Sequence, residues 1–328
     1  MLHIRDTRVE MIQLVLPEHA NILGGLYGGR LMYWLTTASS MAASRVARGP
    51  AVLGSMDDID FINPIKIGEI VIFKAQVEYV GRSSMEVSIV VHSENPQTGE
   101  KKITTSSHMA YVAVDSEGKP REIPQKIEPA PDEIDIYEAA IKRREERLRR
   151  LKRKKEDTIR VKELLNVETQ YRVSVSKIVM PEDATFGRLM FAGKLMLELD
   201  QLAAILAIRY ARGPVVTASL DAMDFYSPLR VGDIMTMNAY LNYVGHTSME
   251  IGVNIFGENP AKNELNHTST AFMTFVHIDE NFCPAPLKPY TPHSEFEKKL
   301  WHEAEERKKS RAQRREELKK LLKSLGYM

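Results

Sequence analysis

The sequence has 328 residues, a length that suits two domains of ordinary size. Hydrophobic residues make up 43% and charged residues 27%, which excludes a disordered chain, and a formal net charge of +1 excludes binding to polyanions through overall charge. The single cysteine, Cys283, excludes a disulfide framework and a multi-cysteine zinc site. Charges appear too early for a signal peptide and the apolar runs are too short to span a bilayer, so we expect a cytoplasmic protein without membrane insertion.

The first half of the chain predicts one long helix followed by strands. A strand-like segment over residues 9–16 leads into a glycine-bearing loop, and the apolar stretch 28–46 has helical character. Four further runs carry the β-branched and aromatic residues typical of strands, at residues 51–61, 70–80, 84–93 and 102–114. A long apolar helix followed by an antiparallel meander indicates an α+β domain whose sheet wraps around the helix.

The second half repeats this order of elements from residue 171 to residue 278. Short words recur at a constant separation of 164 residues: Val15-Leu16-Pro17-Glu18 and Val179-Met180-Pro181-Glu182, Ala47-Arg48-Gly49-Pro50 and Ala211-Arg212-Gly213-Pro214, Asp60-Phe61 and Asp224-Phe225, Ser84-Met85-Glu86 and Ser248-Met249-Glu250. So long a period excludes a solenoid of short repeats and indicates a duplicated whole domain. We therefore expect one domain at residues 1–125 and a second at residues 166–290.

The helix of the second copy is apolar around most of its circumference. Leu195, Leu199 and Leu206 recur at helical spacing, which predicts burial of this helix inside the curl of its own sheet. The methionines, Met85 and Met249 among them, are expected mainly in the core.

A highly charged segment follows each copy. We expect a charged helical linker at residues 126–165 and a charged C-terminal helix at residues 291–328. Leu148 and Leu151 are the only large apolar residues between positions 142 and 155, which predicts a solvated helix rather than part of the core. Because such a segment follows both domains, we expect it to cover sheet edges or to meet a partner rather than to bind nucleic acid.

The loop before each helix, the start of that helix and a later turn form a recognisable series. The first copy reads Asn21-Ile22-Leu23-Gly24-Gly25-Leu26-Tyr27-Gly28-Gly29-Arg30-Leu31-Met32, the second contains Gly193-Lys194-Leu195-Met196-Leu197-Glu198-Leu199-Asp200, and the turn is Val80-Gly81-Arg82-Ser83-Ser84-Met85-Glu86. In this order, and present twice, these segments resemble the hotdog-fold acyl-CoA thioesterases, particularly the tandem double-hotdog acyl-CoA hydrolases. The resemblance covers roughly residues 10–120 and 170–285. It implies a tandem double hotdog of the α+β class that hydrolyses acyl-CoA to free CoA and a fatty acid, with no cofactor other than the CoA of the substrate.

The two copies depart from the family pattern at complementary positions. The first copy has Asn21 and the glycine pair Gly28-Gly29, but Thr36 stands where the family has an acid. The second copy has the acid, Asp200, and lacks the other groups, because Thr185 replaces the asparagine and Ala192 replaces the first glycine. In hotdog dimers of this family, the acid of one protomer faces the carbonyl-polarising groups of the other. The resemblance therefore implies one composite working site per chain and one inactive site made from the replaced residues.

Thioester hydrolysis explains why these residue types are needed. Attack on the thioester carbonyl develops negative charge on its oxygen, and backbone N–H groups at the first turn of a helix stabilise that charge. Gly28 and Gly29 would let the substrate approach the backbone closely, and the Asn21 amide would add a further donor. Asp200 would serve either as general base or as nucleophile, and the sequence leaves both roles open.

Ordinary structural explanations compete with these roles. Asp200 lies about 100° around its helix from the leucine stripe, so it fits a boundary carboxylate that reaches solvent or forms local hydrogen bonds. Asn21 also fits a turn cap, and the loop glycines fit positions of positive φ. The turn residues Arg82, Ser83 and Ser84 and their counterparts His246, Thr247 and Ser248 are candidates for binding the CoA phosphates or pantetheine, or are solvated turn residues.

The alternatives to a hydrolase are a non-catalytic protein and a different enzyme on the same fold. The loss of motif residues from both copies, together with the basic tails, fits a non-catalytic acyl-CoA sensor or scaffold. An acyl-thioester dehydratase on this fold usually needs a histidine on the central helix or its loop, and residues 27–46 contain none. No metal site is expected, because His19, His92, His108 and His267 lack ligand spacing. Analogy with the family predicts a homo-oligomer of three chains.

Overall fold

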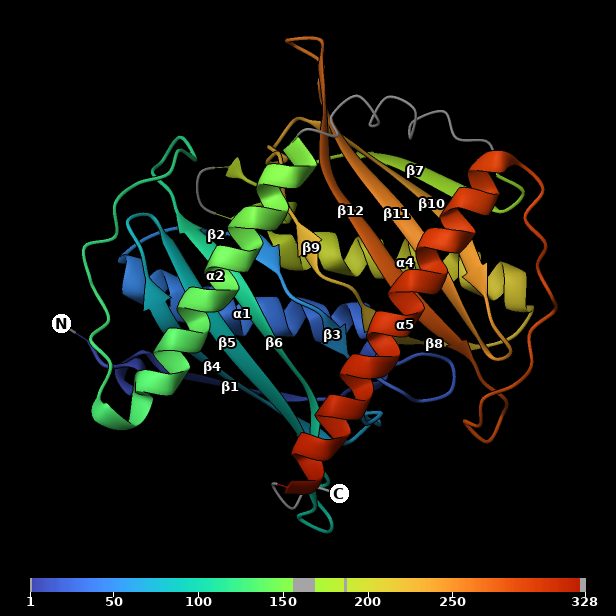
Figure 1. Cartoon of the computed structure of the whole chain (residues 1–328), viewed down its shortest axis with the longest axis horizontal. Helices are drawn as coiled ribbons and strands as arrows, with labels where there is room; N and C mark the ends of the chain where they lie inside the picture. Colours follow the sequence, from blue (N-terminus) through green and yellow to red (C-terminus); the bar gives the residue numbers. More distant parts are fainter. Residues whose placement is uncertain (1, 156–168, 186–187, 325–328) are drawn as a thin grey trace.

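The computed structural model describes residues 2–155, 169–185 and 188–324. Two modules of like architecture stand side by side (Figure 1). The first comprises β1 (Val9–Leu14), α1 (Gly28–Ala47), β2 (Ala51–Met56), β3 (Ile59–Asp60), β4 (Ile70–Val80), β5 (Ser84–Glu94) and β6 (Lys101–Ala113), followed by α2 (Ile134–Lys155). The second comprises β7 (Arg172–Ile178), α4 (Ala192–Ala211), β8 (Val215–Leu220), β9 (Met223–Asp224), β10 (Ile234–Val244), β11 (Ser248–Asn259) and β12 (Glu264–His277), followed by α5 (Glu295–Ser324). Each module has a long helix against an antiparallel sheet, which confirms the α+β double hotdog.

Some expected segments lie outside the described residues. These are residues 156–165 of the expected linker, residues 186–187 in the loop of the second copy, and residues 325–328 at the end of the expected C-terminal helix. The described residues also include 3-10 helices at Ile4–Thr7, Pro17–His19, Pro131–Glu133 and Pro181–Asp183.

Strand order shows that the modules exchange short strands. The two sheets run β1-β4-β5-β6-β2-β9 and β3-β8-β12-β11-β10-β7, so each ends on a strand from the other module. Ser55 of β2 pairs with Asp224 of β9, and Asp60 of β3 pairs with Ser219 of β8. The single strand expected over residues 51–61 is therefore wrong, because the chain crosses from one sheet to the other after Met56. This crossing joins the modules at the place where α1 and α4 also meet.

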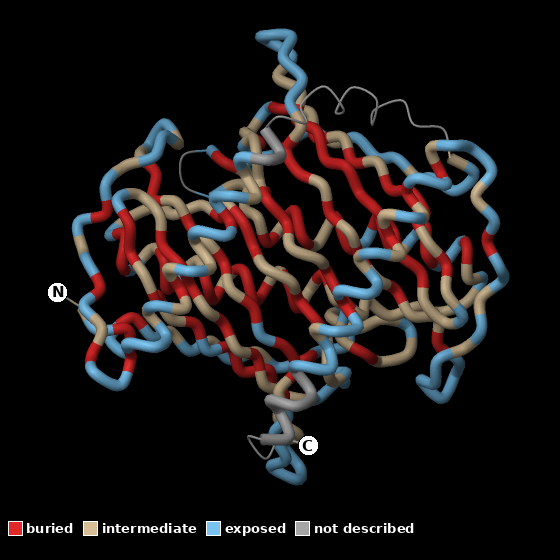
Figure 2. Tube along the Cα trace, in the orientation of Figure 1, coloured by how far each residue is buried: buried red, intermediate tan, exposed pale blue. Residues whose placement is uncertain are grey.

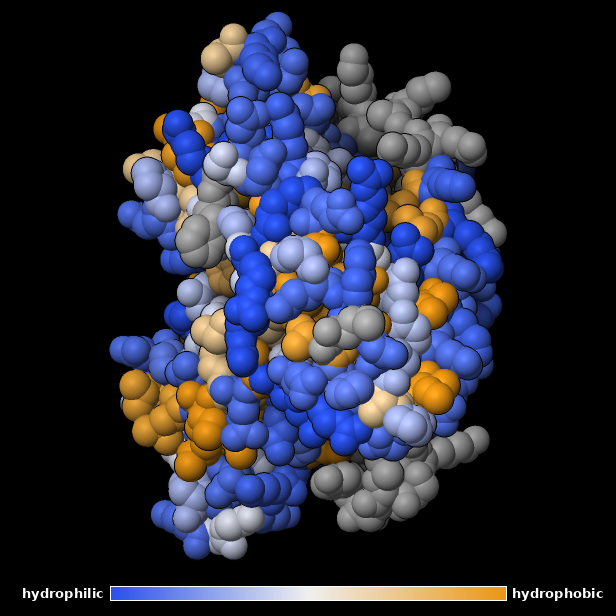
Figure 3. Space-filling view, turned by 90° about the vertical axis from the view of Figure 1, so that its left-hand side faces the viewer, coloured by the Kyte–Doolittle hydropathy of each residue, from blue (hydrophilic) through white to orange (hydrophobic). Residues whose placement is uncertain are grey.

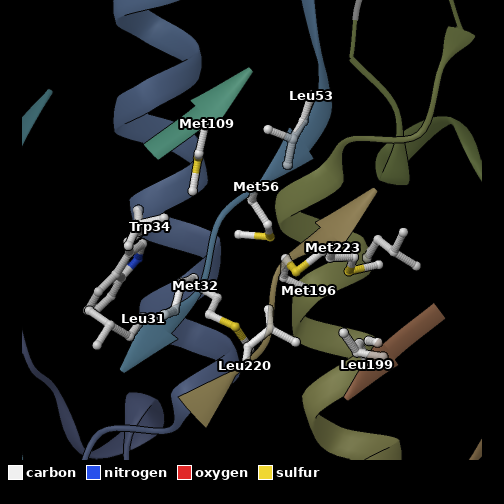
Figure 4. Close-up of a cluster of buried hydrophobic side chains, with 14 of the residues drawn as sticks. Leu31, Met32, Trp34, Leu53, Met56, Met109, Met196, Leu199, Leu220 and Met223 are labelled. Carbon is white, nitrogen blue, oxygen red and sulfur yellow. The ribbon is translucent and has the colours of Figure 1, made fainter. Parts of the chain in front are cut away.

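The two central helices pack against each other and against their sheets. The leucine stripe of α4 is at most 3% exposed, as the helical spacing predicts. Between α1 and α4, side chains from both modules form one continuous core, in which Met32, Met56, Met196 and Met223 lie close together (Figure 4). Met85 and Met249 are also buried, which confirms the methionines as core residues. Figure 2 shows buried residues running through both sheets and both central helices without a break at the module boundary.

The charged helices α2 and α5 cross the face of the sheets that is turned away from α1 and α4 (Figure 1). Their arginines point inward. Arg147 bonds Glu86 and Asp57, and at the corresponding place in the second module Arg311 bonds Glu250 and Asp221. The expectation of solvated helices is therefore wrong for this face, because buried carboxylates on the sheets hold the guanidinium groups there.

Further ion pairs from these helices cross the module boundary. Arg150 of α2 bonds Asp224 of the second module at 2.7 Å, and Arg314 of α5 bonds Asp60 of the first module at 2.6 Å. These two ion pairs are related by the same 164-residue separation as the repeated words, so α2 and α5 connect the two modules in equivalent ways.

A buried glutamate holds the start of each of these helices. Glu297 accepts hydrogen bonds from the N–H groups of Gln170, His293 and Ser294. Burial alone would raise its pKa, but these hydrogen bonds lower the pKa to about 2. Glu133 has the same role before α2, where it accepts from Ile4 and other backbone N–H groups.

Hydrophobic side chains are also found on the surface. Figure 3 shows them gathered on part of the end that carries the first module, away from the side of α2 and α5. Exposed large hydrophobic residues of that module include Ile12 and Leu14 on the edge strand β1, and Ile178 on β7 is the counterpart of Leu14. Within the described part of the chain, none of the helices combines the length and hydrophobicity that crossing a bilayer requires.

Candidate active site

A cavity of about 790 Å³ lies at the junction of the two modules. The first module contributes the loop that contains Asn21, the first turn of α1 at Gly28, and the segment 60–65. The second module contributes Asp200 from α4 and Thr217 from β8. The structure thus brings together the complementary residues that the sequence predicted to cooperate, although Asn21 and Asp200 lie far apart along the chain.

Asp200 is 1% exposed and points at the first turn of α1. Its Oδ2 accepts the backbone N–H of Gly29 at 2.8 Å, and its Oδ1 accepts the hydroxyl of Thr217 at 2.7 Å. The alternative of a carboxylate that reaches bulk solvent is therefore wrong. The positive end of the α1 dipole and two hydrogen bonds replace the water that Asp200 loses on burial.

Burial raises the pKa of Asp200, and the hydrogen bonds from Thr217 and Gly29 offset part of that rise. A carboxylate with a raised pKa is a better proton acceptor than an ordinary surface aspartate. At neutral pH such a group is suited to general-base catalysis or to nucleophilic attack.

The glycine pair is required by close packing across the module junction. A Cβ on Gly28 would lie 2.6 Å from Cβ of Thr217, and a Cβ on Gly29 would lie 2.7 Å from Cβ of Asp200. Only glycine therefore lets the start of α1 approach α4 and β8 this closely. The two amides have different roles: Gly29 is occupied by Asp200, whereas the Gly28 N–H has no acceptor among the described residues. Of the two amides expected to polarise a carbonyl, Gly28 is the one left available.

Asn21 stabilises its own loop through hydrogen bonds and also lines the cavity. Its Oδ1 accepts the N–H groups of Leu23 and Gly25, both at 3.0 Å, so the turn-capping explanation holds. These bonds fix the orientation of the side-chain amide, and within the described part of the chain Nδ2 has no acceptor. An oriented Nδ2 with free donors is what an oxyanion-binding group needs.

Each module of this chain is similar to known proteins. The family model described as "Thioesterase superfamily" matches residues 23–100 and 187–263, one match in each module. A Bacillus subtilis protein named as an uncharacterized acyl-CoA thioester hydrolase is 35% identical over 146 residues, which covers 44% of this chain and 85% of the relative. The chain belongs to the thioesterase superfamily.

Two further known proteins match this chain over both modules. The mouse cytosolic acyl coenzyme A thioester hydrolase is 28% identical over 317 residues, covering 91% of this chain and 82% of the relative. The crystal structure of an acyl-ACP thioesterase from Bacteroides thetaiotaomicron has a TM-score of 0.51 and 13% identity, and it covers 84% of this chain and all of its own. The second likeness shows the fold alone.

Thr217 is a site residue that sequence reasoning missed. Its hydroxyl donates a hydrogen bond to Asp200, and the corresponding position in the first module is Leu53. A hydroxyl in one copy opposed by a leucine in the other was the available signal. Because threonine is common in strands, this difference by itself does not indicate a functional role for Thr217.

A second cavity, of about 330 Å³, occupies the quasi-symmetric position. Its lining includes Thr36, Thr185 and Ala192, the three residues predicted to form an inactive site, and Leu53. The hydroxyl of Thr36 donates to the backbone oxygen of Met32 at 2.8 Å, so it is turned back onto its own helix. The lining residues of this cavity include no charged side chain.

The six turn residues predicted to bind CoA lie elsewhere. Arg82, Ser83, Ser84, His246, Thr247 and Ser248 are found at the β4–β5 and β10–β11 turns, and they are absent from the lining of the large cavity. Their backbone oxygens hold the segments after β6 and β12, as in the bonds from Ile123 to Arg82 and from Leu287 to His246. Contact of their side chains with CoA stays a prediction, and it would have to occur outside this cavity. Among the described residues, no group of three or more His, Cys, Asp or Glu is arranged to hold a metal ion.

Proposed function

We propose that this chain is an acyl-CoA thioester hydrolase with one active site per chain, at the junction of the modules. The observation that carries this proposal is the meeting of Asp200 from one module with Asn21 and Gly28 from the other in a single large cavity. The names of the relatives in the thioesterase superfamily support acyl-CoA as the substrate. The small, uncharged second cavity supports a single working site.

The carbonyl oxygen of the thioester would be bound by the free donors of the first module. The Gly28 N–H lies at the start of α1, where the helix dipole favours negative charge, and Nδ2 of Asn21 lines the same cavity. Both donors are fixed before the substrate arrives, so no reorganisation is needed as the charge on the oxygen grows.

Asp200 would act on the carbonyl carbon by one of two routes. As general base it accepts a proton from water while the water oxygen bonds to the carbonyl carbon, and collapse of the tetrahedral intermediate breaks the C–S bond and releases the CoA thiol. As nucleophile its carboxylate oxygen bonds to the carbon and displaces the CoA thiolate, and water then hydrolyses the mixed anhydride. Thr217 and Gly29 orient the carboxylate in either route.

Neither route uses a group beyond the chain, water and the substrate, so we propose that no cofactor takes part. The relatives named cytosolic support a cytoplasmic location. We also propose a homo-oligomer of three chains, because the edge strands β1 and β7 expose hydrophobic residues at corresponding positions, Leu14 and Ile178.

The test is release of free CoA from a panel of acyl-CoA thioesters of increasing chain length. The wild-type chain is expected to release CoA, and Asp200→Asn and Asn21→Ala are each expected to abolish most of this activity. Rapid quenching followed by mass spectrometry distinguishes the two routes, since only the nucleophilic route leaves an acyl group on Asp200. Tight acyl-CoA binding without CoA release would overturn the proposal in favour of a sensor.

A further inference from the structure

The two modules contain the same tight turn after their last strand. In the second module, the Asp279 N–H donates to the Cys283 oxygen at 2.9 Å and the Phe282 N–H donates to the Asp279 oxygen at 3.1 Å. In the first module, Asp115 and Gly118 make the same two bonds at 2.9 and 3.1 Å. Phe282 and Gly118 therefore occupy equivalent positions in one turn geometry.

That position requires a left-handed backbone. Gly118 has φ of +79° and Phe282 has φ of +61°. Glycine adopts this conformation freely, whereas a side chain with Cβ is strained there. The turn forms with glycine in the first module, so the phenylalanine is not needed to make it. Strain of this kind is typically found where a side chain serves a binding site.

Phe282 lies at the proposed active site, and Gly118 lies at the second cavity. The Phe282 ring is close to the catalytic loop, since a Cβ on Gly25 would be 3.7 Å from ring atom Cε1. Phe282 lines the cavity and is 39% exposed as a residue, so it is accessible to a ligand that enters from solvent.

Arg212 is a second feature that only the large cavity has. It lines that cavity, and its guanidinium makes no hydrogen bond or ion pair with any other described residue. Its counterpart Arg48 has an acceptor: the side-chain oxygen of Gln125 accepts hydrogen bonds from Nε and Nη2 of Arg48 at 3.2 and 3.1 Å. In the second module the position of Gln125 is taken by Pro289, which leaves Arg212 without this acceptor.

We propose that Arg212 and Phe282 form the subsite for the nucleotide part of CoA, with the guanidinium on a phosphate and the ring stacked on the adenine. This inference rests on the proposed acyl-CoA hydrolysis. Arginine pairs with phosphate through two parallel hydrogen bonds, and aromatic rings stack on bases without regard to sequence. Leu31 and Phe275 in the same cavity are almost fully buried and suit the acyl chain, whereas the exposed pair suits the charged end of the substrate.

The other arginine at the cavity is less suitable. Nε of Arg315 is 3.8 Å from Oδ1 of Asp60, so an acidic group already faces its charge. Arg212 has no such neighbour, and it is therefore the residue assigned to the phosphate.

The experiment compares hydrolysis of an acyl-CoA with hydrolysis of the acyl-pantetheine that has the same acyl group. The variants are Arg212→Ala, Phe282→Gly, which copies the first module, and Phe282→Leu, which keeps apolar bulk without an aromatic face. We expect each to raise KM for acyl-CoA about tenfold and to leave KM for acyl-pantetheine unchanged. Arg209→Ala is the matched control, because Arg209 is exposed in the last turn of α4, three residues before Arg212, and does not line the cavity.

Equal changes of KM for both substrates would overturn the assignment, since the pair would then contact the acyl or pantetheine part. Unchanged KM for acyl-CoA would overturn it as well. Phe282→Gly relieves backbone strain, so its melting temperature should be at least that of the wild type, and lost binding cannot then be attributed to unfolding. Calorimetric titration with CoA and pantetheine separates this inference from the proposed function: if neither thioester is hydrolysed, weaker CoA binding by the variants still supports the subsite, and unchanged CoA binding overturns it.

Discussion

Equivalent elements of the two modules form the two cavities at the module junction, but the cavities differ in most of their functional groups. The large one contains a buried carboxylate held by a helix N-terminus and a hydroxyl, with free donors from the other module beside it. In the small one, Thr36 is bonded to its own helix and Leu53 replaces the hydroxyl of Thr217. The difference supports the proposal that one complete set of catalytic groups, contributed partly by each module, forms a single active site.

The surrounding framework did not diverge in this way. Arg147 and Arg311 make equivalent ion pairs, and Glu133 and Glu297 cap equivalent helices. These contacts stabilise each module in the same way, so the loss of either member of a pair should destabilise the fold to a similar extent. Variants at equivalent positions of the two modules therefore distinguish residues with a proposed catalytic role, which differ between the modules, from residues that maintain the fold, which are equivalent.

The largest effect is expected for Asp200→Asn. It removes the base or nucleophile and should lower kcat by at least about 10²–10⁴-fold. The matched variant in the other cavity, Thr36→Val, should leave kcat within about twofold, because that hydroxyl only bonds its own helix. Steady-state kinetics with one acyl-CoA measure both. Equal losses from the two variants would contradict a single working site.

Gly28→Ala should lower kcat about 10²-fold, because the new Cβ would meet Thr217 at 2.6 Å and push the start of α1 away from Asp200. The opposite change at the corresponding position, Ala192→Gly, should leave kcat unchanged. Thermal melting of both variants shows whether the fold is kept. Retained activity in Gly28→Ala would mean that the close approach of α1 to Thr217 and Asp200 is not needed for catalysis.

Thr217→Val should lower kcat about tenfold and shift its pH dependence. The Thr217 hydroxyl favours the ionised form of Asp200, so removing it raises a pKa that burial has already raised. Because Asp200 must be ionised to react, the acidic limb of the kcat profile should move to higher pH. A profile that keeps its wild-type position would show that this hydrogen bond does not set the ionisation of Asp200.

The smallest effect concerns the symmetric framework. The pKa of Glu297 is about 2 in the folded protein against an ordinary 4.5, so its stabilising contribution is fully present above pH 4.5 and is lost as pH falls toward 2. Glu297→Gln should lower the free energy of unfolding at pH 7 by about 1–3 kcal/mol, with a difference from wild type that shrinks below pH 4.5. Chemical denaturation at several pH values measures this. Glu133→Gln should behave similarly, and a large kcat change in either variant would argue against a purely structural role.

Much of the architecture was predictable because it depends on local pattern. The constant separation between repeated words indicated two modules, and the leucine spacing of α4 indicated a buried helix. The pairing of Asp200 with Asn21 came from resemblance to a family, because nothing local places residues of two modules in one cavity. Nothing local places Thr217 beside Asp200 either, and the difference from Leu53 in the first module was the available signal.

The sequence by itself determined the duplication, the two central helices and the complementary loss of motif residues, since each is a matter of spacing or residue type along the chain. Tertiary structure alone decided that the segment 51–61 divides between two sheets, that the arginines of α2 and α5 turn inward, and that the Gly29 amide holds Asp200. These features arise where surfaces from distant parts of the chain meet. Burial there makes each charged or polar group depend on partners that its own neighbourhood in the sequence does not reveal.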